Sequence, residues 1–96
     1  MLMSEFIKEN NIPKKNEFNE FYTLTDEQFN LLEKAVKETF PTQRKTINYG
    51  MPFSYWLKYI FEKKLGFQIS NYDIKLVMQK LGFKGGYIQK YILTNN

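Results

Sequence analysis

Residues 52–65 carry the most regular amphipathic pattern of the chain, and this pattern most limits how it can fold. Pro52 suits the first turn of a helix, where its missing amide hydrogen costs nothing, and Gly66 suits the position after the last turn. The apolar side chains recur at helical spacing: Phe53, Trp56, Leu57, Ile60, Phe61 and Leu65. The width of this stripe predicts a central core helix in which Trp56 is buried.

Residues 25–40 carry a second helix signal. Thr25 can accept a hydrogen bond from an early amide of the helix, while Gln28 reaches back to the amide of Thr25, which is the capping-box arrangement. Pro41 cannot continue a helix, so we expect the helix to end near Phe40. A shorter helix is expected within residues 1–12, with Ser4 as its cap and Pro13 beyond its end.

Ser70 and Asp73 mark the start of a further helix, with the same three-residue spacing of cap and partner. Gly82 is expected to end it, with Phe83 as an apolar anchor just beyond. The buried face is predicted to hold Ile74, Val77, Met78 and Leu81, with Leu76 on the outer side. The alternation in residues 67–69 predicts a short strand before this helix.

Gly85 and Gly86 predict a β-hairpin between Phe83 and Leu93, because glycine tolerates the positive φ of tight hairpin turns. Helix, short strand, capped helix and hairpin is the element order of a winged helix-turn-helix. We therefore expect a mostly α (α+β), winged-helix-like single domain over residues 1–96. Residues 1–23 would form an N-terminal extension, and residues 24–93 would form the helical core with its C-terminal hairpin.

The composition argues against most enzyme classes. The chain has no Cys and no His, which removes disulfides, the usual zinc ligands, thiol nucleophiles and imidazole-based catalysis. No two acidic residues form a pattern that demands a metal. We therefore expect no catalytic residues, no metal and no cofactor, and a protein that is not an enzyme. The lack of Cys also fits a reducing intracellular, cytoplasmic location, and we expect no membrane partner.

The charge is unevenly distributed along the chain. Residues 1–48 carry seven Lys/Arg against eight Asp/Glu, and residues 49–96 carry seven Lys against two acids, so the two halves have net charges of −1 and +5. A basic half on a small protein favours an acidic partner such as nucleic acid or an acidic protein surface. A solvated, Lys-rich surface without a partner is the other interpretation of the same charge.

The winged-helix interpretation predicts where nucleic acid would bind. In that arrangement the second helix of the pair lies in the major groove, and the hairpin approaches the phosphates. Asn71, Lys75 and Gln79 would form the exposed face of this recognition helix, with Lys80 at its edge. Amides can pair with adenine edges, and lysine can bind guanine or phosphate. Two further lysines, Lys84 and Lys90, would contact phosphates from the wing.

The segment Arg44-Lys45 followed by Asn48-Tyr49 lies between an acid-capped helix and an aromatic helix. With Leu24-Thr25 before it and Leu65-Gly66 and Leu81-Gly82-Phe83 after it, residues 24–84 resemble the C-terminal part of the poxvirus-type viral late transcription factor 3 family. The resemblance implies a role in late transcription of a large DNA virus or a related element, with Arg44 and Lys45 contacting phosphate or a partner. The chain lacks the family's Cys-rich zinc segment and is shorter.

Two functions remain open on these observations. The first is a non-enzymatic nucleic-acid-binding accessory protein in the transcription or replication of a virus or mobile element. The second is a protein-interaction adaptor, inhibitor or structural subunit of a larger assembly, whose exposed aromatic side chains complete the surface of a protein partner. Arg44 could equally pair with an acid of the same chain, and Tyr49 could simply pack where the aromatic helix begins.

Overall fold

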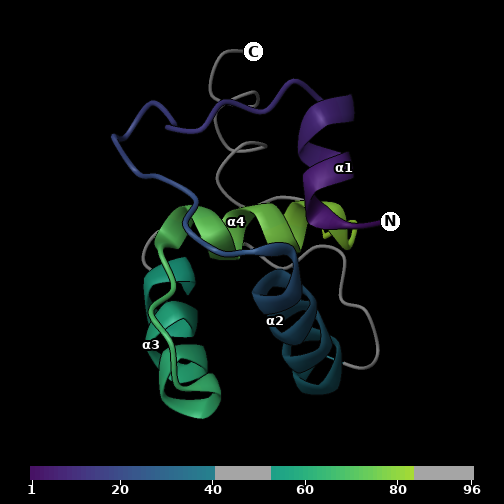
Figure 1. Ribbon diagram of the computed structural model, residues 1–96. Helices are drawn as coiled ribbons and strands as arrows, with labels where there is room; N and C mark the ends of the chain where they lie inside the picture. Colours follow the sequence, from purple (N-terminus) through teal and green to yellow (C-terminus); the bar gives the residue numbers. More distant parts are fainter. Residues whose placement is uncertain (41–52, 84–96) are drawn as a thin grey trace.

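The protein is mostly α-helical in the computed structural model, which describes residues 1–40 and 53–83 (Figure 1). Within these ranges there are four helices, α1 (Met3–Glu9), α2 (Asp26–Thr39), α3 (Phe53–Leu65) and α4 (Asn71–Lys80). Each of the other three helices contacts α4, and α2 also contacts α1 and α3. In Figure 1, α4 crosses between α1 on one side and the neighbouring pair α2 and α3 on the other.

Local chemistry explains where α2 and α4 begin. Gln28 N donates to Thr25 Oγ1 at 3.2 Å, and Thr25 N donates to Gln28 Oε1 at 3.0 Å. At α4, Asp73 N donates to Ser70 Oγ at 3.0 Å, and Ser70 N donates to Asp73 Oδ2 at 2.8 Å. Both predicted capping boxes are confirmed, and each satisfies amides that have no partner inside the helix.

Two glycines supply the left-handed backbone that follows a helix. Gly66 has a φ of +84° after α3, and Gly82 has a φ of +88° after α4. A side chain disfavours this conformation, so glycine is the residue expected at these positions. Phe83 is buried beyond Gly82, as predicted.

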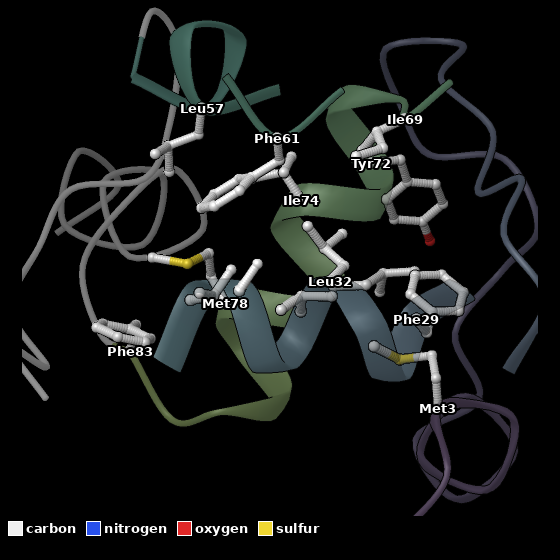
Figure 2. Close-up of a cluster of buried hydrophobic side chains, with 14 residues drawn as sticks. Met3, Phe29, Leu32, Leu57, Phe61, Ile69, Tyr72, Ile74, Met78 and Phe83 are labelled. Atoms are coloured by element: carbon white, nitrogen blue, oxygen red, sulfur yellow. The ribbon is translucent and has the colours of Figure 1, made fainter. Parts of the chain in front are cut away.

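A single apolar cluster holds the four helices together (Figure 2). In Figure 2, side chains of α3 and α2 converge on Ile74 and Met78 of α4, and Met3 of α1 lies beside Phe29. A fully buried side chain of this size stabilises the fold by about 1.5–3 kcal/mol. The fully buried large apolar residues are Phe29, Phe61, Met3, Leu32, Leu57, Ile69, Ile74, Leu76, Met78, Val36 and Val77.

Several sequence-based predictions about this core are wrong. The central helix is α4 and not α3, because α4 contacts all the other helices and residues 72–78 are all buried. Trp56 was expected in the core but is 58% exposed, whereas Leu76 was expected outside and is 1% exposed. The residues predicted as a strand, 67–69, form none, because within the described residues the only bridge is an isolated one between Lys15 and Phe21.

The N-terminal helix also differs from its prediction. Leu2, and not Ser4, is the residue that precedes the first turn of α1. Ser4 instead links α1 to the start of α2, because its Oγ donates to Asp26 Oδ2 at 2.7 Å and its amide donates to Asp26 Oδ1 at 2.9 Å. The helix ends at Glu9, before Pro13. Between them, Asn11 takes a positive φ of 51°.

Thr25 provides a test of how much the local signals contribute. Thr25→Ala should lower the free energy of unfolding by about 1 kcal/mol, since it removes the side-chain acceptor at the start of α2. Urea denaturation followed by far-UV circular dichroism measures this loss. Thr25→Ser keeps the hydroxyl and should stay close to the unmodified protein, and equal losses for both variants would contradict a capping role.

The predicted hairpin over residues 83–93 lies outside the described residues, apart from Phe83 itself. Among the helices of the described ranges, none has both the length and the apolar character of a membrane span.

Candidate functional site

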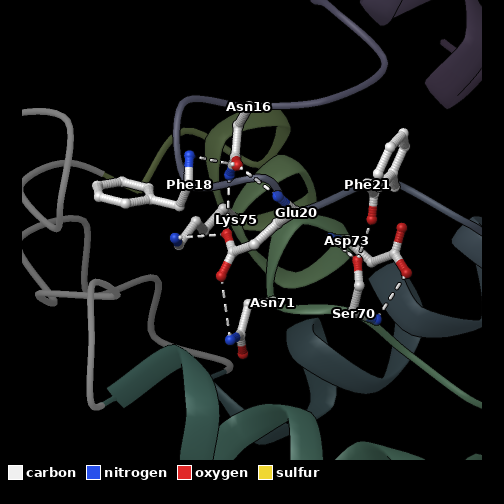
Figure 3. Close-up of polar contacts among 8 residues, drawn as sticks. All are labelled: Asn16, Phe18, Glu20, Phe21, Ser70, Asn71, Asp73 and Lys75. Atoms are coloured by element: carbon white, nitrogen blue, oxygen red, sulfur yellow. Dashed lines mark hydrogen bonds and ion pairs between the residues drawn. The ribbon is translucent and has the colours of Figure 1, made fainter.

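The most organised polar cluster joins the segment before α2 to the outer side of α4 (Figure 3). Lys75 Nζ lies 3.0 Å from Glu20 Oε1, and the Lys75 side chain is only 4% exposed. Asn16 Nδ2 donates to the same oxygen of Glu20 at 2.8 Å, and Asn71 Nδ2 donates to Glu20 Oε2 at 3.2 Å. The Lys75 ammonium also lies 5.1 Å from the centre of the Phe18 ring, a cation–π distance. Lys75 therefore contributes to the interior of the protein.

A second carboxylate ties the same segment to the first turn of α4. Asp73 is fully buried. Its Oδ1 accepts from the amide of Thr23 at 2.8 Å, and its Oδ2 accepts from Thr23 Oγ1 at 2.7 Å. Ser70 Oγ, visible beside it in Figure 3, donates to the carbonyl of Phe21 at 2.6 Å. The capping residues of α4 thus also hold a segment about fifty positions earlier in the chain.

Burial and hydrogen bonding act in opposite directions on Glu20. Burial alone raises the pKa of its carboxyl, but the hydrogen bonds from Asn16 and Lys75, the positive charge of Lys75 and the hydrogen bond from Asn71 together lower the pKa below its ordinary value of 4.5. Glu20 is therefore charged at neutral pH. It neutralises Lys75 where an anionic ligand would otherwise be needed.

Tyr72 holds the beginning of the same segment. Its hydroxyl donates to the carbonyl of Pro13 at 2.6 Å, and its ring lies 5.9 Å from the ring of Tyr22. Burial, followed by the neighbouring Tyr22, raises the pKa of the Tyr72 phenol above its ordinary value of 10.0. The phenol therefore stays protonated at neutral pH and keeps donating this bond.

The remaining basic residue predicted on α4 is also paired inside the protein. Lys80 Nζ lies 2.8 Å from Glu33 Oε1 of α2, and both side chains are largely buried, at 11% and 9% exposure. Glu33 Oε2 is buried and has no hydrogen-bond partner among the described residues. This ion pair fastens the end of α4 to the middle of α2.

The exposed recognition face predicted for α4 is therefore wrong. Asn71 and Lys75 contact Glu20, Lys80 contacts Glu33, and no residue of α4 is classed as exposed. The physical reason is that the segment before α2 covers the outer side of α4 and supplies the counter-charge of Lys75, while α2 supplies that of Lys80. The other predicted site residues, Arg44, Lys45, Lys84 and Lys90, lie outside the described residues.

The fourth residue of that predicted face, Gln79, lines an open pocket. The pocket has a volume of about 370 Å³ and lies between residues 12–17 and α4. Its apolar part comes from Ile12, Tyr72 and Leu76. The described residues contain no group of three or more His, Cys, Asp or Glu side chains that could hold a metal ion.

One surface, on α3, was not predicted from the sequence. Tyr55, Trp56 and Tyr59 are exposed on the side of the helix opposite the buried Leu57 and Phe61, and the less exposed Ile60 borders them. The signal was present in the sequence, since Tyr55, Tyr59 and Lys63 recur at four-residue steps and therefore share one face. These side chains, Tyr55, Trp56, Tyr59, Ile60 and Lys63, are called the α3 aromatic face below.

The chain is thus a mostly α-helical protein in its described part, with an internally paired polar cluster and one exposed aromatic helix face. It matches no protein-family model, no curated protein and no solved structure. The resemblance of residues 24–84 to the viral late transcription factor 3 family stays a prediction.

Proposed function

We propose that the protein is a non-enzymatic nucleic-acid-binding accessory factor whose phosphate contacts come from residues 41–52 and 84–96. The supporting observation is the distribution of charge. Residues 1–40 and 53–83 together hold ten Lys and ten Asp/Glu, so their net charge is zero. The remaining four cations are Arg44, Lys45, Lys84 and Lys90, and the two segments that contain them have no acid. The entire excess of +4 therefore belongs to these two segments.

The two basic segments begin beside one another in the described part. The chain enters residues 41–52 after Phe40 and residues 84–96 after Phe83. The rings of Phe40 and Phe83 pack edge to face, with their centres 6.0 Å apart. A segment that contains Lys or Arg and no acid attracts a polyanion. Two such segments that begin close together should bind a polyanion more strongly than either alone.

Of the winged-helix interpretation, this proposal keeps the predicted hairpin, the wing. A hairpin over residues 83–93 would direct Lys84 and Lys90 towards phosphates, which position a protein on nucleic acid without reading its sequence. We do not expect α4 to contact bases, because the lysines of that helix are paired with Glu20 and Glu33. The proposed role is accessory, in the transcription or replication of a virus or mobile element.

The salt dependence of binding tests the proposal. Affinity for single-stranded and duplex oligonucleotides should fall as salt rises, because each phosphate contact releases counterions. In the double variant Arg44→Ala/Lys45→Ala, the slope of log K against log salt should shrink by about 1.4–1.8, at about 0.7–0.9 for each lost contact. Fluorescence anisotropy measures both slopes, over salt concentrations from about 25 mM to about 200 mM.

The matched control removes the same charge from another place. Lys34 and Lys37 are exposed on α2, so Lys34→Ala/Lys37→Ala changes net charge equally and should leave the slope nearly unchanged. Equal losses in both double variants would mean a diffuse charge effect without a site. No binding at low salt, together with co-purification of a protein partner, would reject nucleic-acid binding in favour of the adaptor function.

A further inference from the structure

One side of α3 presents large aromatic side chains to solvent. Tyr59 is 76% exposed, Tyr55 is 59% exposed and Trp56 is 58% exposed, whereas Leu57 and Phe61 of the same helix are each 1% exposed. The core therefore uses one face of α3, and the aromatic side chains of the opposite face are largely exposed. Tyrosine and tryptophan lose little side-chain entropy on binding and offer large flat surfaces, so such a face suits a ligand that is itself flat.

Lys63 gives this face a positive charge. Lys63 lies four residues beyond Tyr59 and is exposed, and no carboxylate of the described residues lies within ion-pair distance of it. The only acid of α3, Glu62, is bound by other groups of the protein. Its Oε2 accepts from the amide of Ile69 at 2.8 Å, and its Oε1 lies 3.4 Å from Lys58 Nζ. The α3 aromatic face is thus aromatic and cationic.

The next lysine, Lys64, lies on the other side of α3, in line with Leu57 and Phe61. Lys64 Nζ is 3.8 Å from Glu38 Oε1, with both side chains at least half exposed. An exposed pair at this distance contributes little and is easily exchanged for another anion. Lys64 thus lies outside the α3 aromatic face, and Lys63 supplies the positive charge at the end of the row of aromatic rings.

We propose that the α3 aromatic face is a base-stacking surface for single-stranded nucleic acid, a proposal that rests on the nucleic-acid-binding function above. Unpaired bases stack on aromatic side chains whatever their sequence, while lysines follow the phosphate backbone. Bases inside a duplex are already stacked on one another, so their faces are not open to these rings. The face therefore selects single strands, whereas the basic segments 41–52 and 84–96 bind phosphates of either form.

Substitution of Tyr59 tests this surface. Tyr59→Ala should weaken binding of a single-stranded oligonucleotide about tenfold, because the loss of one stacked base is of that order. The salt slope should stay the same, since no charge is removed, and duplex binding should be unchanged. Tyr59→Phe keeps the ring and should retain the affinity. Oligo-dT and oligo-rU in parallel distinguish DNA from RNA as the source of the bases.

Two further measurements make the result specific. Trp56 is the only Trp of the chain, so its fluorescence should be quenched by an unlabelled single strand and not by a duplex. Phe21→Ala removes an exposed ring (48% exposed) of the segment before α2, and this control should bind like the unmodified protein. Circular dichroism should show that all variants are folded, because Tyr59 and Phe21 are both exposed.

The outcomes separate this inference from the function on which it rests. Salt-dependent binding that Tyr59→Ala leaves unchanged would overturn the stacking surface and leave the proposed function standing. No binding by the unmodified protein at low salt would overturn both. If Tyr59→Ala instead abolished self-association or capture of a protein partner, with single-strand binding intact, the face would be a protein interface and the inference would be wrong.

Discussion

Replacing Lys75 with methionine should lower the free energy of unfolding by about 3 kcal/mol, because removing one member of a buried ion pair leaves its partner without a counter-charge. The Lys75 ammonium lies 3.0 Å from Glu20 Oε1, with side-chain exposures of 4% and 20%. Methionine keeps much of the apolar stem, so the loss reports mainly the charge. We place the effect at the lower end of the usual range because Glu20 keeps its hydrogen bonds from Asn16 and Asn71.

A double-mutant cycle identifies the pair as the cause. Glu20→Gln removes the charge of the acid, so Lys75→Met/Glu20→Gln should lose less stability than the sum of the two single variants. Lys58→Met is the matched control, since Lys58 lies 3.4 Å from Glu62 with side-chain exposures of 29% and 24%. This more open pair should contribute less than about 1 kcal/mol. Urea denaturation at pH 7 measures the unmodified protein and all four variants, and a fully stable Lys75→Met would contradict the role described for Glu20.

The same pair sets a pH dependence. The pKa of Glu20 is lower in the folded protein than its ordinary value of 4.5, so the unfolded chain binds a proton more readily. Glu20 therefore contributes stability above about pH 4.5 that is lost as the pH falls through the lower, folded value. The difference in stability between the unmodified protein and Lys75→Met should accordingly be largest near neutral pH and shrink in acid. A difference that grew in acid would have the wrong sign.

This prediction also changes how a binding defect in Lys75 variants is interpreted. From the sequence, Lys75 was expected to contact nucleic acid, so weaker binding by Lys75→Ala would have supported a recognition helix. Because Lys75 is buried against Glu20, the same variant should weaken binding by destabilising the fold. Nucleic-acid binding should therefore be compared among variants only where circular dichroism shows equal folded fractions.

The parts of the fold that the sequence predicted depend on contacts between near neighbours. Thr25 with Gln28 and Ser70 with Asp73 are three residues apart, and these pairs fix where α2 and α4 begin. Gly66 gives a similarly local signal at the end of α3. Such signals need no knowledge of the rest of the chain, which is why the helices could be placed correctly.

The orientation of the helix faces depends on partners far away in the sequence. Lys75 looks like a surface residue until Glu20, fifty-five positions earlier, is placed beside it. Apolar and aromatic residues surround most of α3, so the pattern could not decide that Trp56 would be exposed. On α4, the burial of Leu76 likewise depends on a segment far away in the sequence. The candidate site on α4 was misplaced for this reason. The segment before α2, which has little regular structure, covers the face of α4 that the sequence pattern predicted to be exposed.

Replacing Asp73 with alanine should cost about 3 kcal/mol, the second large effect expected for this protein. Its carboxylate is fully buried and accepts three hydrogen bonds, two from Thr23 and one from the amide of Ser70. Each bond to a charged group contributes about 1.5–3 kcal/mol, and unpaired donors left behind add to the loss. The carboxylate also lies in the first turn of α4, where negative charge is favoured.

Two matched variants divide this effect into its parts. Thr23→Val removes the hydroxyl donor and keeps the amide donor, so it should lose about 1 kcal/mol. Asp73→Asn keeps the shape and one carbonyl acceptor but removes the charge, and its amide hydrogens would oppose the amide of Ser70. It should therefore fall between Thr23→Val and Asp73→Ala in urea denaturation. If Asp73→Asn matched the unmodified protein, the charge of the carboxylate would contribute nothing, and a single acceptor oxygen would be enough to hold Thr23.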